Sequence, residues 1–175
     1  AASAPASSST AGAGTAASPF GTRLIAGSMN TSTVVATAGT WANLGFTTVA
    51  YDTDSMATVG AAAGFTVPVD GVYHFDAYVH FLADFQGTPP AASGYQVAIG
   101  LWIDGVFTKR MDDYYSDIAR AAGSPAIALS LSGSCDHTVF AGSFCEMRIL
   151  VFSGNGNCTM DGGAVSNWFN IRRVH

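Results

Sequence analysis

Apolar and polar side chains alternate along the stretch from Gly64 to Leu82, which carries the clearest pattern in the sequence. Beyond the turn pair Asp70-Gly71, one set of alternate positions is apolar: Tyr73, Phe75, Ala77, Val79 and Phe81. The set between them is polar or amphipathic: His74, Asp76, Tyr78 and His80. A period of two is typical of a β-strand that has one face on a hydrophobic core. The stretch therefore predicts two strands joined by a tight turn.

Shorter versions of this pattern recur along the chain and are separated by frequent turns. They predict nine or ten strands, over residues 22–26, 33–37, 41–51, 63–67, 72–82, 95–103, 106–110, 126–131, 138–151 and 164–174. The pair Asp104-Gly105 suits a type I′ hairpin turn, because both residues tolerate positive φ. Turn chemistry predicts a loop over residues 86–94, and residues 111–122 are the one stretch with helical character. So many short strands indicate an all-β sandwich, jelly roll or barrel.

The first 18 residues contain only Ala, Ser, Gly, Thr and one Pro. A segment of this composition cannot bury enough apolar surface to offset the entropy lost on ordering. We therefore predict a low-complexity N-terminal arm over residues 1–19 and a single domain over residues 20–175. Two interpretations of the arm stay open: a linker, or an anchor held by a partner outside its own domain.

The chain is poor in charge, with 11% charged and 49% hydrophobic residues. Soluble domains usually contain about 25% charged residues, so we expect other copies or partners to cover much of this surface. The net charge of −5 gives no basic footprint for nucleic acid, and the sequence has no run of about 18 apolar residues for membrane insertion. Cys135, Cys145 and Cys158 lack paired C-x-x-C spacing, which leaves three thiols or one disulfide as interpretations.

Four motifs follow one another in order: Ala50-Tyr51-Asp52, Gly64-Phe65-Thr66-Val67-Pro68-Val69-Asp70-Gly71-Val72-Tyr73-His74-Phe75, Leu101-Trp102-Ile103-Asp104-Gly105 and Ser166-Asn167-Trp168-Phe169-Asn170-Ile171-Arg172. Together they resemble the complement C1q globular head, a tumour-necrosis-factor-like (TNF-like) jelly roll, over about residues 41–174. The stretch from Gly142 to Val174 looks more like the bacterial and phage members of that family. The resemblance implies a ten-stranded jelly-roll sandwich that assembles as a trimer and binds through exposed loops without catalysis.

Two of the expected strands present small or apolar residues where solvent normally favours charge. They are Ala98, Gly100 and Trp102 on one strand, and Ala126, Ala128 and Ser130 on another. Small residues allow a neighbour to approach, and Trp102 or Trp168 can fill the space between the chains. We predict a trimer interface that contains Ala98, Gly100, Trp102, Ala128 and Trp168. The alternative is a second layer of the same chain over these strands.

One segment combines charge with aromatic side chains: Asp112, Asp113, Tyr114, Tyr115, Asp117 and Arg120. Paired carboxylates can serve glycoside hydrolysis, and tyrosine beside aspartate can hold a sugar or a receptor side chain. We predict a ligand or receptor contact, because no other acid or base in the sequence indicates catalysis. The alternative is a solvated loop.

The remaining candidate clusters predict no metal and no cofactor. His74 and His80 share a strand face with Asp76, but they lie about 20 Å apart at the rise of a strand. Asp52, Asp54 and Asp70 flank turns without the spacing of a known calcium loop. The run Ser134-Cys135-Asp136-His137 is a poor catalytic triad, because adjacent strand residues point to opposite faces.

We therefore expect a non-enzymatic virion protein, a trimeric capsid decoration, fibre or head-spike protein of a bacteriophage. A capsid or tail protein would hold its arm, and residues 84–94 and 109–125 would point outward to a host-surface glycan or protein. A second hypothesis is a secreted or cell-surface, extracellular module that binds glycan or protein. A third is a polysaccharide hydrolase that uses the carboxylates of residues 112–117. None of the three involves nucleic acid or membrane insertion.

Overall fold

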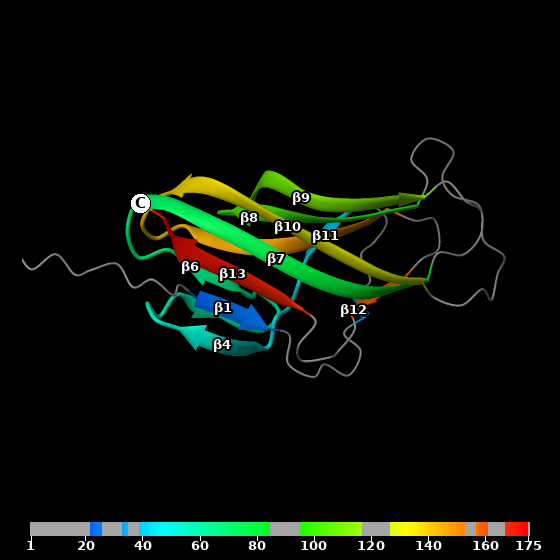
Figure 1. Cartoon of the computed structure of the whole chain (residues 1–175), viewed down its shortest axis with the longest axis horizontal. Helices are drawn as coiled ribbons and strands as arrows, with labels where there is room; N and C mark the ends of the chain where they lie inside the picture. The colour runs from blue at the N-terminus through cyan, green and yellow to red at the C-terminus, as the bar shows by residue number, and fades with distance from the viewer. Residues whose placement is uncertain are drawn as a thin grey trace, which may run out of the picture.

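The computed structural model describes residues 22–25, 33–34, 39–84, 95–116, 127–152, 157–160 and 167–174, which form strands and turns and no helix (Figure 1). Sheet A contains β1 (Thr22–Ile25), β2 (Thr33–Val34), β4 (Thr48–Asp52), β7 (Gly71–Asp84), β10 (Ile127–Val139), β12 (Asn157–Met160) and β13 (Trp168–Arg173). Sheet B contains β3 (Trp41–Asn43), β5 (Ala57–Thr58), β6 (Gly64–Thr66), β8 (Tyr95–Ile103), β9 (Val106–Ser116) and β11 (Phe144–Phe152). No helix in this described part of the chain is long enough to cross a membrane.

The long strand β7 is the centre of sheet A. Along one side it pairs with β10 over the whole length of that strand, and along the other side it pairs first with β13 and then with β12. The strands β1 and β4 extend the sheet beyond β13. Sheet B follows the order β5-β6-β11-β8-β9, with β3 also paired to β11. Because consecutive strands repeatedly change sheets, the two layers are interlocked by their connections.

The hydrophobic core lies between the two sheets and is rich in aromatic rings. Phe169 on β13 has ring centroids of Phe65, Phe46 and Phe75 at 4.8, 6.2 and 6.2 Å. The predicted apolar face of β7 is confirmed, because Tyr73, Phe75, Ala77, Val79 and Phe81 are all buried in this core. Burial of such side chains contributes roughly 2–3 kcal/mol each, so the core stabilises the sandwich from both layers.

The stretch from Gly64 to Leu82 does contain two strands, but they do not form a hairpin. β6 lies in sheet B and β7 in sheet A, so the connection over residues 67–70 carries the chain from one layer to the other. The hairpin predicted around Asp104-Gly105 is confirmed, with φ values of 51° and 76° at those two residues.

The helical prediction for residues 111–122 is wrong where the structure describes it. Residues 111–116 continue β9, which pairs with β8 up to Tyr95 opposite Ser116. Sheet pairing prevails over local capping because Tyr114 packs against the core and the Asp112 carboxylate accepts a hydrogen bond from the backbone of β10. Residues 117–122 and the predicted loop over 86–94 lie outside the described residues.

Two further strand boundaries differ from the predicted ones, and two short strands are additional. β10 continues from the predicted strand at 126–131 as far as Val139, and β11 begins only at Phe144. The short strands β5 and β12 were not expected, because neither has an alternating pattern of its own. β12 is instead held by its antiparallel pairing to β7 and β2.

β9 and β10 approach each other closely where the edges of the two sheets meet. A Cβ atom on Gly133 of β10 would overlap the backbone carbonyl oxygen of Met111 on β9. Only glycine leaves room for this contact. The seam between the sheets therefore depends on Gly133.

The described chain begins and ends at one end of the sandwich, here called the terminal end. Thr22 pairs with Ile171, and the chain continues three residues past that position to Val174 (Figure 1). At the opposite end, here called the loop end, β7 and β9 finish and β8 and β10 begin. Ile127 pairs there with Ala83. The two ends of the long axis are therefore structurally different.

Hydrogen bonds join the connections at the terminal end into one unit. The amide N–H of Gly142 donates to the carbonyl of Val67 at 2.7 Å, and the amide N–H of Ala141 donates to the Asp70 carboxylate at 2.7 Å. The amide N–H of Val174 donates to the carbonyl of Val72 at 2.8 Å. The last described residue is thus tied to the start of β7.

Candidate functional site

Three aromatic rings lie together on the outer face of sheet B. Trp41, Trp102 and Phe107, here called the aromatic platform, come from β3, β8 and β9. The ring centroids of Trp41 and Phe107 are 5.4 Å apart, and that of Trp102 lies 6.1 and 5.8 Å from the two. The platform lies over Gly100, where a Cβ atom would be 3.1 Å from ring atoms of both Trp41 and Phe107. The missing side chain lets the rings lie close to the sheet.

A polar cluster borders the platform on the β11 side. Glu146 is only 6% exposed and is the one glutamate of the chain. Its carboxylate accepts hydrogen bonds from the Arg148 guanidinium, with Nε at 2.8 Å, and from Asn43 Nδ2 at 2.7 Å. The Arg148 guanidinium also lies 4.1 Å from the ring centroid of Trp102, a cation–π contact. Charge and aromatic surface are therefore joined at this position.

Two polar atoms in this region are buried without a hydrogen-bond partner among the described residues: Trp102 Nε1 and Asn43 Oδ1. Buried donors and acceptors are nearly always paired in native proteins. These two atoms mark the polar cluster as the part of the described structure whose hydrogen bonding is incomplete.

A second polar cluster borders the platform on the β9 side. Arg110 Nη1 lies 3.5 Å from Asp113 Oδ2, and Gln96 Nε2 donates to the same oxygen at 3.2 Å. In the strand register, Arg110 stands opposite Gly100 and Asp113 stands opposite Ala98. Arg148 stands opposite Gly100 from the other side. The two polar clusters therefore flank the small residues of β8.

The structure separates the residues predicted as one ligand-binding loop. The Asp112 carboxylate accepts hydrogen bonds from the amides of Ser132 at 2.8 Å and Asp113 at 2.9 Å, so it joins β9 to β10. Tyr114 packs against the core. Asp113 and Tyr115 stand opposite Ala98 and Gln96, and Tyr115 is exposed. Asp117 and Arg120 lie outside the described residues, and a ligand-binding role for this set stays a prediction.

The residues predicted as a trimer interface lie on two different sheets. Ala98, Gly100 and Trp102 belong to β8 of sheet B, whereas Ala128 and Trp168 belong to β10 and β13 of sheet A. Ala98 and Gly100 are buried within the chain itself. A second copy that approached sheet B would meet the rings above them. A trimer interface that contains all five residues stays a prediction, and it would need both outer faces, because each subunit of a ring uses two different surfaces.

The outer face of sheet A has a different character. Its largest contact is the pair Tyr78 and Trp168, whose rings stack with centroids 6.3 Å apart. The Tyr78 hydroxyl donates to Ser130 Oγ at 2.9 Å. Ala128, Ser130, Ser132 and Ser134 are exposed along β10. This face therefore combines small and hydroxyl-bearing side chains with one stacked aromatic pair.

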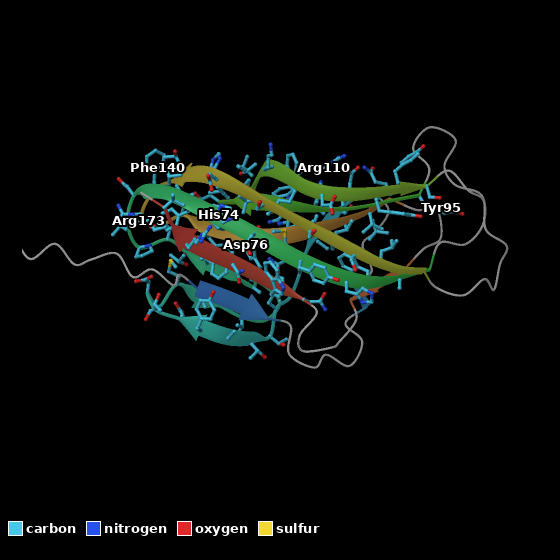
Figure 2. All side chains as sticks on the ribbon, viewed as in Figure 1. His74, Asp76, Tyr95, Arg110, Phe140 and Arg173 are labelled. Carbon is cyan, nitrogen blue, oxygen red and sulfur yellow. The ribbon has the colours of Figure 1, made fainter. Side chains whose placement is uncertain are left out.

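Near the terminal end, the same face carries a charged cluster around His74, which Figure 2 shows on β7 beside Asp76. His74 Nδ1 lies 2.6 Å from Asp136 Oδ1, and His74 Nε2 lies 3.8 Å from Asp76 Oδ2. Asn170 Nδ2 donates to Asp76 Oδ1 at 2.5 Å. Within the described residues, no three His, Cys, Asp or Glu side chains are placed to hold a metal ion.

Aspartates at turns serve the backbone. Asp52 accepts hydrogen bonds from the amides of Met56 and Ala57 at 3.0 and 2.9 Å. Asp70 accepts one from Ala141, and Asp104 accepts one from Phe144 at 2.8 Å. These carboxylates are occupied in fixing connections, which explains why aspartates flank the turns.

The cysteines that the structure describes are thiols. Cys145 is buried and Cys135 is partly buried, and both are free. Burial raises the pKa of Cys145 to about 12 and also raises the pKa of Cys135. Neither thiol is therefore a ready nucleophile, since the reactive form is the thiolate. The side chain of Cys158 lies outside the described part, so its state is still a prediction.

Sequence reasoning missed Trp41, Phe107, Glu146 and Arg148 as parts of one surface. The available signal was the alternation of Glu146 and Arg148 on a strand whose other face is apolar, together with a glycine in the neighbouring strand. It was not sufficient, because the pairing of β3 with β11 and of β9 with β8 decides which rings meet.

No protein-family model and no curated protein sequence matches the chain. Among solved structures, the chain is similar to Eiger TNF from S. frugiperda, with a TM-score of 0.58, 15% identity and coverage of 90% of this chain and 94% of that one. It is also similar to the globular domain of zebrafish complement 1qA protein, with a TM-score of 0.51, 16% identity and coverage of 89% and 98%. Murine APRIL at pH 8.0 gives a TM-score of 0.56, 9% identity and coverage of 87% and 98%. These structures share the fold of this chain, and the predicted fold class is confirmed.

Proposed function

We propose that this chain, which has a C1q/TNF-like jelly-roll fold, is a non-enzymatic trimeric binding module on the exterior of a bacteriophage particle. It would act there as a capsid decoration, fibre or head-spike protein. One fold can serve many functions, so the support for this proposal comes from the surfaces of the molecule. The low charge of the chain supports a molecule that is partly covered by copies of itself and by an assembly.

The single observation that carries this proposal is that the two ends of the sandwich differ, with the start of the described chain at one end and the ends of β7 and β9 at the other. Thr22, the first described residue, lies at the terminal end. The strands β7 and β9 finish at the opposite end. An arm held by a capsid or tail protein would therefore direct the loop end away from the particle. Residues 109–116, first expected as part of an outward loop, are strand and contribute only the last residues of β9 to that end.

Trimer contacts on this proposal use the outer face of sheet A. That face combines exposed small residues at Ala128 and Ser130 with the stacked pair Tyr78 and Trp168. Small residues allow backbones to approach, and aromatic side chains dominate many interfaces. The burial of Gly100 beneath its own chain supports leaving the sheet B face outside the contact.

The second candidate is a secreted or cell-surface module of the same fold that binds glycan or protein. The observation in its favour is the aromatic platform with its bordering charges, because such surfaces are typical of recognition. The hydrolase hypothesis has weaker support, since the Asp112 carboxylate is engaged by two backbone amides.

Light scattering of the purified chain tests the trimer, and we expect three times the monomer mass at micromolar concentration. A monomer at that concentration would contradict the central part of the proposal.

Deletion of residues 1–19 tests the anchor. We expect the deletant to remain a folded trimer and to be absent from purified particles that incorporate the full chain. Incorporation of the deletant at the full level would remove the anchoring role and favour the secreted module.

The double variant Asp112→Ala, Asp113→Ala tests the enzyme hypothesis. We expect no polysaccharide turnover by the full chain. Turnover by the full chain that the double variant lacks would make the chain a hydrolase.

A further inference from the structure

We propose that the aromatic platform on sheet B is a binding site for a neutral pyranose sugar. Trp41 and Phe107, whose rings are inclined to each other by 32°, form the stacking surface, and Trp102 lies edge-on beside them. This inference rests on the proposed function, because it names the ligand class and the location of a binding surface on the same non-enzymatic module. The outer face of sheet A, the proposed trimer contact, takes no part in it.

The first argument is the shape of the platform. Phe107 is 44% exposed, and Trp41 and Trp102 are partly exposed. Gly100 lets the rings of Trp41 and Phe107 lie close to the sheet, so together they form a low surface rather than isolated side chains. An aromatic face attracts the C–H groups that line one side of a pyranose ring, because the face carries partial negative charge.

The second argument is the spacing of the polar groups. The Arg110–Asp113 pair stands on β9 and the Arg148–Glu146 pair stands on β11, with β8 between them. Adjacent strands lie about 4.8 Å apart, so the two clusters are separated by about 10 Å. That distance suits a single sugar ring with its hydroxyl groups. Carboxylate and guanidinium groups are planar and can make two parallel hydrogen bonds, which matches a pair of neighbouring hydroxyls.

The third argument concerns charge. Each guanidinium at the site is already paired with a carboxylate: Arg110 with Asp113, and Arg148 with Glu146. A phosphate or a sugar acid would need an unpaired cation, whereas a neutral sugar needs donors and acceptors of both kinds. The chain's net charge of −5 also disfavours an anionic ligand.

The fourth argument is the unsatisfied pair of atoms. Trp102 Nε1 is a donor and Asn43 Oδ1 an acceptor, and both are buried without a partner among the described residues. Each buried polar atom without a partner needs an explanation, and a functional site is one place where such atoms occur. The departure here coincides with the aromatic and polar groups that the first three arguments identify.

Tryptophan fluorescence gives a direct test, because the chain has three tryptophans and two of them belong to the platform. The Trp168→Phe variant leaves emission from Trp41 and Trp102 alone. This variant is titrated separately with the methyl glycosides of glucose, galactose, mannose and N-acetylglucosamine, each to 100 mM. We expect a saturable change in emission with at least one glycoside, at millimolar dissociation constant, as is typical of a single sugar.

A second substitution locates the site. Phe107→Ser, made in the Trp168→Phe background, should weaken the binding about tenfold through loss of one stacking ring. Phe140→Ser is the matched control, since Phe140 is 67% exposed and lies between β10 and β11, outside the three rings of the platform (Figure 2). It should leave the affinity unchanged. Circular dichroism and light scattering on each variant check that the fold and the assembly are retained.

Two results would overturn the inference. One is the absence of any saturable change with all four glycosides. The other is equal binding by the Phe107→Ser variant and its parent. If no glycoside binds and Phe107→Ser removes the chain from particles, the platform contacts a protein instead. After either of these results, a chain that is still trimeric and anchored by its arm would continue to support the proposed function. A monomer that still binds sugar would instead refute the trimer and support the sugar site.

Discussion

The outer face of sheet B is covered by rings of its own chain, whereas the outer face of sheet A presents small hydroxyl and methyl groups. Both faces contain short side chains at alternate positions, Ala98 and Gly100 on one and Ala128 and Ser130 on the other. In sheet B both positions are buried, and Gly100 lies under Trp41 and Phe107. In sheet A they are exposed. A small residue on a strand therefore has two structural meanings: room for a ring of the same chain, or room for another molecule.

A charge placed on each face gives the largest expected difference between them. In the proposed trimer, Ser130→Arg should convert the assembly to a monomer at micromolar concentration, a weakening of more than about 100-fold, because an unpaired charge would be buried between subunits. Light scattering measures the mass directly. Tyr115→Arg on sheet B is the matched variant and should remain trimeric. The reverse outcome would move the trimer contact to sheet B.

Gly133 at the seam between the sheets and Gly100 beneath the aromatic platform should differ in how much stability is lost when a methyl group is added. Gly133→Ala should lower the free energy of unfolding by about 3 kcal/mol, because the new Cβ would meet backbone of Met111 that cannot move alone. Gly100→Ala should cost less than about 1 kcal/mol, since the atoms it meets are the far ends of Trp41 and Phe107. Urea denaturation of both variants checks this. Equal losses would show that the platform is as rigid as the backbone seam.

The ion pairs of the two faces should also differ. Glu146→Ala should cost about 2 kcal/mol of unfolding free energy, because the Arg148 guanidinium loses its carboxylate acceptor and the Asn43 amide keeps only the carbonyl of Ala63. Asp136→Ala should cost less than about 1 kcal/mol, since the Asp136 side chain is 60% exposed and water screens its pair with His74. Denaturation at equal protein concentration compares them, and a larger loss for Asp136→Ala would refute the ranking.

The smallest expected effect is a pH dependence of stability that comes from Cys145, whose thiol is buried in the core between the sheets. The pKa of Cys145 rises from its ordinary value of 9 to about 12 on burial. Between pH 9 and pH 12 the unfolded thiol loses its proton while the folded thiol keeps it, so stability falls as pH rises. The slope from this group is at most about 1.4 kcal/mol per pH unit, and below pH 9 the contribution is complete.

Chemical denaturation from pH 8 to pH 11 measures this slope, and the variant Cys145→Ala is its control. The variant should be less stable at pH 8 and should lose stability less steeply above pH 9. Part of the slope should remain, because burial also raises the pKa of Tyr73. An unchanged slope would exclude Cys145 as its source.

Most of the fold could be predicted from the sequence because strand periodicity is a local signal. The alternation from Tyr73 to Phe81 gives the core face of β7 directly, and Asp104-Gly105 gives its hairpin from turn chemistry alone. The pairing of the strands could not be predicted in the same way. That β6 and β7 lie in separate sheets depends on contacts with β11 and β10, which no local pattern contains.

The candidate site was predicted less well, and for the same reason. The aspartates and tyrosines of residues 112–115 were grouped because they are consecutive, yet a strand sends consecutive side chains to opposite sides. Asp112 therefore serves β10 while Asp113 faces outward. The platform joins residues of three strands that are far apart in the sequence. Such a surface becomes visible only once the strand register is known.

The position of β13 has a consequence for how the molecule is made. This strand ends at Arg173, near the end of the given sequence, yet it lies inside sheet A between β7 and β1. Until residues 168–173 emerge during synthesis, β7 and β1 each present an unpaired edge, and unpaired edges invite aggregation. Thr22 cannot pair with Ile171 until Ile171 has been synthesised. Pairing between residues so far apart in the sequence is intrinsically slow. A chain without residues 168–173 would thus lose a strand from the interior of sheet A.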